Sequence, residues 1–128
     1  MRRAVGVVRE AYSKWERRAP LTPDHVARLT RSGVATFVQP CSKRIFDNAE
    51  YTAAGAVITD DLSQASAIFG VKQVPVEQLL PNKTYMFFTH TIKAQEENMP
   101  LLDECLRRNI RLLDYECVRK DGDSTQPR

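Results

Sequence analysis

Apolar runs of strand length alternate with helical patterns along almost the whole chain, and this alternation limits the fold more than any other feature of the sequence. Helices between successive strands indicate parallel β–α–β units. The runs are almost continuously apolar, as strands buried on both faces require. We therefore predict an α/β domain with a mostly parallel sheet and helices on both faces. The strand-like runs are 4–8, 35–40, 56–59, 67–72, 84–90 and 110–116, and the helical segments between them are 21–33, 47–55, 60–65, 74–81 and 92–109.

Capping residues predict where two of the helices begin and end. Thr22 and Pro23 suit the start of the first helix, and Gly33 suits its end. Asp47 and Gly55 bound the second helix in the same way.

Two finer predictions concern the second half of the chain. Pro100 is expected to break the helical segment 92–109, because proline lacks a backbone N–H group. The run "TYMFF" is the longest apolar stretch among the strands, so we expect it at the centre of the sheet, with Phe87 or Phe88 facing the core.

The composition fits one globular domain of 128 residues, with 42% hydrophobic and 27% charged residues. The net charge of +3 is spread along the chain, so we expect no nucleic-acid partner. No apolar run approaches the roughly 20 residues of a membrane span, and the basic start lacks the apolar segment of a secretory signal. We expect an intracellular protein without membrane contact. Cys41, Cys105 and Cys117 are widely spaced, which indicates buried thiols rather than disulfides or a metal site.

Ionisable side chains follow three of the strand-like runs. Lys72 follows "AIFGV", His90 follows "MFFT", and Glu116 closes "IRLLDYE". In open parallel sheets, ligands gather beyond the carboxyl ends of the strands. An amine and an imidazole at one such edge could exchange protons with a ligand. Each residue alone is as well explained by a solvated lysine or by a hydrogen-bonded loop histidine.

The loop after the first strand carries further charges in "KWERRAPLTP", namely Lys14, Glu16, Arg17 and Arg18. An arginine there could bind a carboxylate through two hydrogen bonds. The simpler interpretation is a solvated run of charges. Lys93 could lie over the same edge or on the surface.

Several nucleotide and nucleophile motifs are missing. The sequence contains no G-x-G-x-x-G after a strand, no P-loop and no G-x-S-x-G. The first strand runs into "REAYSKWERR", which has no glycine. The predicted fold is therefore Rossmann-like without the dinucleotide fingerprint. If the chain serves a dehydrogenase, it would supply the other wall of the cleft.

The segments "KWERRAPLTPDH", "GVKQVP", "FFTHTIKAQEENMPLLD" and "LLDYE" resemble the N-terminal domain of lysine–2-oxoglutarate reductases. These domains form the first part of the bifunctional α-aminoadipic semialdehyde synthases of lysine degradation. The resemblance runs from about Ala4 to Glu116, nearly the whole chain. The wider superfamily includes alanine dehydrogenase, proton-translocating transhydrogenase and the lysine-forming saccharopine dehydrogenases.

The resemblance implies a reductive amination in which L-lysine and 2-oxoglutarate form an imine that NADPH reduces to saccharopine. It implies that Lys72 and His90 are the acid–base pair, that Arg18 and Lys93 bind substrate carboxylates, and that Glu116 tunes the pair electrostatically. It implies that a covalently linked nucleotide-binding domain, absent here, binds most of the NADPH. A mitochondrial or cytoplasmic location and an oligomeric state are both compatible with it.

The sequence departs from the family pattern in two respects. Gln73 stands where the lysine-forming enzymes have an acidic residue beside the catalytic lysine. The chain also ends before any nucleotide-binding domain, so we expect residues 1–116 to be the substrate-side domain, 117–128 a loop or linker, and the isolated chain inactive. Two alternatives stay open: an alanine dehydrogenase or transhydrogenase-type domain, and a stand-alone module that binds an amino acid or 2-oxo acid.

Overall fold

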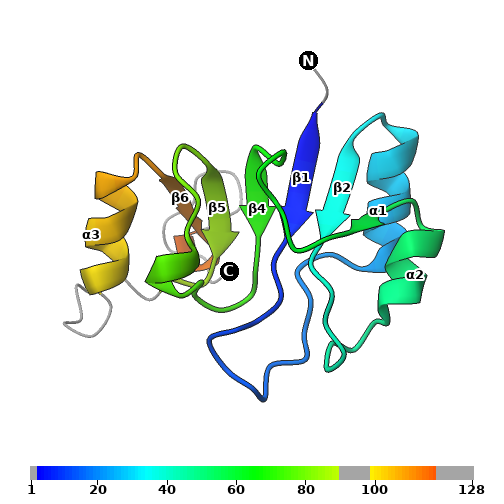
Figure 1. Ribbon diagram of the computed structural model, residues 1–128, viewed down its shortest axis with the longest axis horizontal. Coiled ribbons are helices and arrows are strands. Elements are labelled where there is room, and N and C mark those ends of the chain that lie inside the picture. Colours follow the sequence, from blue (N-terminus) through cyan, green and yellow to red (C-terminus); the bar gives the residue numbers. More distant parts are fainter. Residues whose placement is uncertain (1–2, 90–98, 118–128) are drawn as a thin grey trace.

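The computed structural model describes residues 3–89 and 99–117. Six strands form one sheet in the order β3-β2-β1-β4-β5-β6, and every neighbouring pair is parallel (Figure 1). This confirms the predicted parallel α/β architecture. The strands are β1 (Ala4–Val7), β2 (Ala35–Val38), β3 (Val57–Ile58), β4 (Ala67–Phe69), β5 (Thr84–Phe87) and β6 (Arg111–Asp114).

The described residues also form three α-helices and two short 3₁₀ helices, of which η3 follows the last strand. Figure 1 shows α1 and α2 grouped beside β2, and α3 at the opposite end of the sheet, beside β5 and β6. The helices are α1 (Pro23–Arg31), α2 (Asn48–Ala53), α3 (Met99–Arg107), η1 (Val76–Gln78) and η3 (Tyr115–Cys117). Among these described residues, no helix has the length and apolar character needed to cross a membrane.

The predicted caps of the first two helices are confirmed. The Thr22 side chain accepts a hydrogen bond from the backbone N–H of His25 at 3.2 Å, and Pro23 is the first residue of α1. Asp47 is the N-cap of α2. Both helices end at glycines with positive φ, 84° at Gly33 and 107° at Gly55, a conformation that side chains with a Cβ disfavour.

Two apolar clusters cover opposite faces of the sheet. Paired residues of neighbouring parallel strands point to the same face, so Val7 and Val38 share one face, and Ile68 and Tyr85 share the other. The first cluster packs against α1 and α2, and the second against η1 and α3. Helices therefore lie on both faces, as predicted. The second cluster consists of Leu62, Ala65, Ile68, Val74, Leu79, Tyr85, Phe87, Leu101 and Cys105.

Two local predictions were wrong. Segment 60–65 forms bends and turns instead of a helix. The predicted break near Pro100 falls at the start of the described helix, where proline is the second residue of α3, and the part of the segment before Met99 lies outside the described residues. The strand containing "TYMF" is not central: β5 lies one place from the edge, and β1 and β4 form the centre. The length of an apolar run reports burial, whereas the order of strands depends on how the connections cross.

Candidate functional site

The sheet reverses its winding direction between β1 and β4, and this point is where the candidate site lies. Along the chain, β1, β2 and β3 extend towards one edge, and β4, β5 and β6 towards the other. Chains that leave β1 and β4 therefore continue to opposite faces of the sheet, and at such a switch point we expect a ligand-binding crevice beyond the carboxyl ends of the strands. The loop after β1 is long and extends beyond the carboxyl end of the sheet (Figure 1).

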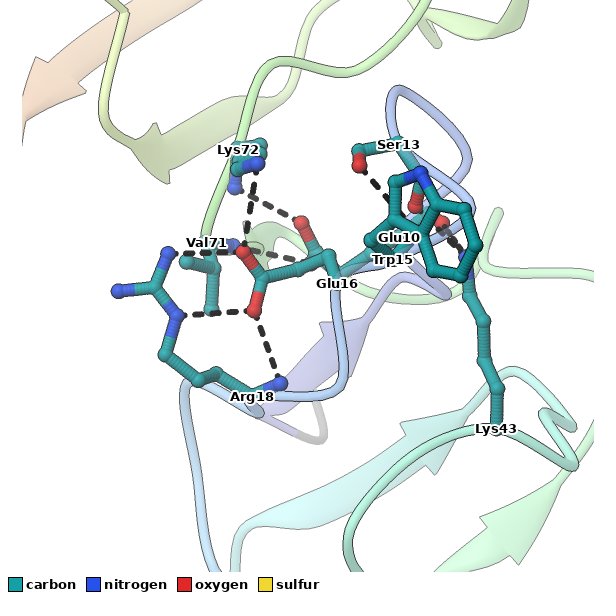
Figure 2. Close-up of polar contacts among 8 residues, drawn as sticks. All are labelled: Glu10, Ser13, Trp15, Glu16, Arg18, Lys43, Val71 and Lys72. Carbon is teal, nitrogen blue, oxygen red and sulfur yellow. Dashed lines mark hydrogen bonds and ion pairs between the residues drawn. The ribbon is translucent and has the colours of Figure 1, made fainter.

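Glu16 is the centre of a charged cluster in this crevice. Its side chain is only 5% exposed. The Arg18 guanidinium donates to both Glu16 oxygens, from Nε at 2.8 Å and from Nη2 at 2.7 Å, and the Arg18 backbone N–H donates at 2.9 Å. The Lys72 Nζ lies 3.7 Å from Glu16 Oε1 (Figure 2). Glu16 thus joins a cation of the β1 loop to a cation of the β4 loop.

A second buried carboxylate, Glu10, lies beside the first. One Glu10 oxygen accepts a hydrogen bond from the backbone N–H of Val71 at 2.9 Å, and the other accepts one from the backbone N–H of Lys72 at 2.7 Å. On the other side, the Lys43 ammonium donates to the backbone carbonyls of Glu10 and Ser13, at 2.8 Å and 2.7 Å (Figure 2). The loop after β1 is therefore held from both sides.

The two carboxyl groups have opposite electrostatic environments. The hydrogen bond from Arg18 lowers the pKa of Glu16 to about 2. Burial raises the pKa of Glu10, although the amides of Lys72 and Val71 act against this shift. Burial also raises the pKa of Tyr115, to about 12. Adjacent carboxyl groups whose environments separate their pKa values are a recurring feature of acid–base sites.

The structure brings together two of the predicted site residues, Lys72 and Arg18, through their shared partner Glu16. Their side chains are 39% and 68% exposed, so both can reach a ligand in the crevice. Lys72 lies beyond the end of β4 rather than on the strand. Glu116 lies in η3, just after β6, and its backbone N–H donates to Asp114 Oδ1 at 3.0 Å.

The remaining predicted residues, His90 and Lys93, lie outside the described residues. The described segment just before His90 does lie next to the β4 loop, because the backbone N–H of Phe88 donates to the Val71 carbonyl at 3.0 Å. The Gln73 carboxamide donates to the carbonyl of the buried Thr89. Gln73 therefore links the segments that follow β4 and β5.

Sequence reasoning missed Glu10 and gave Glu16 no role beyond a solvated charge run. Glu10 follows closely on an apolar strand, which is the position where a side chain points into the crevice, and this was the available signal. The local sequence does not indicate that Glu16 is buried, because it does not show that Arg18 folds back on this carboxylate or that Lys72 of a loop distant in sequence lies beside it.

A separate hollow of about 440 Å³ lies near the end of β1, lined in part by Arg9, Asp60, Asp61 and Glu77. Arg9 pairs there with Asp60. The residues of the charged cluster do not line this hollow, so the hollow and the cluster are separate features at the carboxyl end of the sheet. Within the described parts of the chain, no group of histidine, cysteine or carboxylate side chains is arranged to hold a metal ion.

The residues at the switch point do not fit a dinucleotide. In Rossmann domains a glycine-rich turn after β1 leads straight into a helix whose N-terminus receives the pyrophosphate. Here the segment between β1 and α1 contains no glycine, and two buried carboxylates, Glu10 and Glu16, lie in it. Their negative charge opposes a pyrophosphate.

The titration of Glu16 gives a first prediction. Its carboxyl should titrate near pH 2 in carbon-detected NMR, against a usual value of 4.5. Because the folded-state pKa is the lower one, ionised Glu16 stabilises the fold above about pH 4.5, and this contribution disappears as the pH falls towards 2. Glu16→Gln should therefore destabilise the chain most near neutral pH, and the difference from wild type should shrink on acidification.

The matched control is Glu77→Gln, since Glu77 is exposed in η1 and distant in sequence from the cluster. A Glu16 carboxyl that titrates at its usual value would show that the pair with Arg18 does not form in solution.

The fold and the crevice define a Rossmann-like α/β domain without the dinucleotide fingerprint. More particularly, the chain belongs to the alanine dehydrogenase/PNT N-terminal domain family, whose model matches residues 6–127.

Individual relatives agree with the family. The chain is 53% identical over 108 residues to the mitochondrial α-aminoadipic semialdehyde synthase of Bos taurus, a match that covers 84% of this chain and 12% of that protein. It is 31% identical over 112 residues to the saccharopine dehydrogenase (NAD(+), L-lysine-forming) of Yarrowia lipolytica, covering 84% and 30%. The resemblance found in the sequence motifs is confirmed. The chain spans well under two thirds of these relatives.

A solved structure confirms the fold independently. An L-alanine dehydrogenase superposes with a TM-score of 0.78 at 23% identity, covering 94% of this chain and 34% of the other. At this identity the similarity concerns the fold alone.

Proposed function

We propose that this chain is the substrate-side domain of a saccharopine-forming lysine–2-oxoglutarate reductase. The observation that carries the proposal is the cluster of Lys72, Glu16 and Arg18 at the switch point, in a chain 53% identical to a semialdehyde synthase. We assign residues 1–116 to this domain and 117–128 to a connection towards a nucleotide-binding domain. The name of the bovine relative favours a mitochondrial location.

The proposed roles follow from the chemistry of imine formation. The ε-ammonium of substrate lysine must lose a proton before its nitrogen can attack the ketone carbon of 2-oxoglutarate. The carbinolamine that forms must then gain a proton on its hydroxyl group, so that water leaves and the imine remains. Lys72 is proposed to take and return these protons, with His90 as the second group. Glu16, 3.7 Å away, holds the Lys72 amine at the crevice.

Substrate carboxylates need fixed cations. Arg18 presents Nε and Nη2 to Glu16, and its exposed guanidinium keeps further N–H groups for a carboxylate. Lys93 is proposed as a second cation, and Glu116 as a residue that tunes the acid–base pair. NADPH would supply the hydride that converts the imine to saccharopine, and we assign its binding to a separate nucleotide-binding domain.

The test is an enzyme assay on a chimaera in which this chain replaces the matching segment of the bovine relative. We expect oxidation of NADPH that requires both L-lysine and 2-oxoglutarate, with saccharopine as the product. The isolated 128-residue chain, as the control, should show no such activity, because it lacks the glycine-rich turn that would bind the pyrophosphate of NADPH and so position the nicotinamide.

Other substrates separate the proposal from its alternatives. Activity with pyruvate and ammonium in place of lysine and 2-oxoglutarate would favour an alanine dehydrogenase-type domain. An inactive chimaera, together with tight binding of an amino acid or 2-oxo acid to the isolated chain, would favour a stand-alone binding module.

A further inference from the structure

We propose that Glu10 is a positioning residue: its buried carboxylate fastens the loop after β4 to the loop after β1, and so sets Lys72 against Glu16 and Arg18. The contacts of Glu10 do not depend on the proposed function. Only the expected effect on turnover rests on it.

Both oxygens of Glu10 are used in this connection. They accept the consecutive backbone N–H groups of Val71 and Lys72, at 2.9 Å and 2.7 Å, in a site where Glu10 is 6% exposed. Hydrogen bonds to an ionised acceptor are roughly twice as strong as neutral ones. Two such bonds to adjacent residues fix the direction of the backbone from which the Lys72 side chain leaves.

Gly70, the residue before Val71 in the β4 loop, has no side chain, and this contact requires that absence. A Cβ added at Gly70 would lie 2.9 Å from Val8 Cγ2 and 3.5 Å from Glu10 Oε2. Gly70 therefore lets the β4 loop approach the end of β1 closely enough for the carboxylate to reach both amides.

Lys43 fixes the other end of the connection. Its ammonium donates to the backbone carbonyls of Glu10 and Ser13, which braces the β1 loop from the side of β2 (Figure 2). Glu16 follows in the same braced loop and reaches the Lys72 amine at 3.7 Å. The β1 loop thus holds Lys72 twice, at its backbone through Glu10 and at its side chain through Glu16.

Several ionisable groups from different elements face Glu10. Glu16 and Arg18 face it from its own loop, Arg44 from the segment after β2, Lys72 from the β4 loop and Tyr115 from η3. Burial, with the charge of Glu16, raises the pKa of the Glu10 carboxyl, and the two amide donors and Arg44 oppose the change.

The first test uses NMR of the 128-residue chain. Glu10→Gln keeps the shape of the side chain but leaves one acceptor oxygen and turns an NH₂ group towards an amide donor. Hydrogen exchange at the amides of Val71 and Lys72 should accelerate about 10- to 100-fold, the loss expected for a charge-assisted hydrogen bond. Amides of the sheet interior, such as Val38, should keep their exchange rates, and Glu77→Gln is the matched control. Unchanged exchange at both loop amides would overturn the proposal.

A titration of the wild-type chain covers the case in which Glu10→Gln fails to fold. The amide resonances of Val71 and Lys72 should shift together with the Glu10 carboxyl carbon, with one midpoint above 4.5. Amides that do not follow the Glu10 carboxyl would overturn the assignment without any variant.

The second test measures the consequence in the bovine chimaera. Misplacing a reacting group by about 1 Å can cost about 10²-fold in rate, so Glu10→Gln should lower kcat by about that factor. KM for 2-oxoglutarate should stay within about threefold, because Arg18 remains. An equal loss in kcat and gain in KM would indicate general loosening and would contradict a positioning role. An inactive parent chimaera would refute the proposed function, and the NMR results would still decide the role of Glu10.

Discussion

In the active chimaera, Lys72→Met should lower kcat about 10²- to 10⁴-fold, the loss typical of removing one acid–base group. Methionine keeps much of the length and apolar stem of lysine but cannot take or give a proton. KM for 2-oxoglutarate should change by less than about threefold, because the proposed carboxylate-binding residue, Arg18, is untouched. Steady-state kinetics between about pH 6 and 9 measure both quantities. His90→Gln should have a comparable effect on kcat.

Two control substitutions separate chemistry from charge and from binding. Lys83 lies directly before β5, at the amino ends of the strands, where its Nζ donates to the Ser63 carbonyl. Lys83→Met should therefore leave kcat unchanged. Arg18→Ala should mainly raise KM for 2-oxoglutarate, whereas Arg17→Ala should not, because the Arg17 Nε donates to the Lys43 carbonyl and not to Glu16. Near-normal turnover of both Lys72→Met and His90→Gln would mean that these residues are not the acid–base pair.

The architecture could be predicted from the sequence because it depends on local patterns. Continuous apolar runs separated by capped helices specify parallel strands, and the caps at Thr22 and Asp47 and the glycines at Gly33 and Gly55 mark helix ends through contacts within a few residues. The position of β5 could not be predicted in this way. β1 and β4 are neighbours in the sheet, although β2 and β3 lie between them in the sequence. The length of an apolar run carries no information about that connection.

The candidate site could be predicted only in part, for a related physical reason. Lys72 follows a strand directly, and its place at the carboxyl edge follows from the fold class. The burial of Glu16 comes from Arg18 and from a loop distant in sequence, so the same letters "KWERR" describe equally well a solvated charge run. Glu10 is a functional candidate because its two carboxylate oxygens accept hydrogen bonds from consecutive backbone N–H groups of the β4 loop, and the sequence does not show these contacts.

The stability of this arrangement depends on the apolar cluster beneath β4 and β5, and Phe87→Ala should destabilise the chain by about 3–5 kcal/mol. The Phe87 side chain is 0% exposed, and its ring centroid lies 6.2 Å from that of Tyr85 in an edge-to-face contact. It packs in one cluster with Leu101 and Cys105 of α3. Alanine would leave a cavity between β5 and α3, and these two elements could fill it only by moving from their positions in the sheet and the helix layer. Urea unfolding followed by circular dichroism measures the loss.

Phe88→Ala is the matched control, since it removes the same ring from the next residue along the chain. The Phe88 ring faces Tyr115 of η3, with centroids 5.0 Å apart, and Phe88 is half-buried rather than enclosed. Solvent already reaches this position and can fill the space that alanine leaves, so we expect a loss of about 1–2 kcal/mol, well below that of Phe87→Ala. A loss below about 1 kcal/mol for both variants would show that this segment does not belong to the core, because a cavity in a close-packed interior always costs more than that.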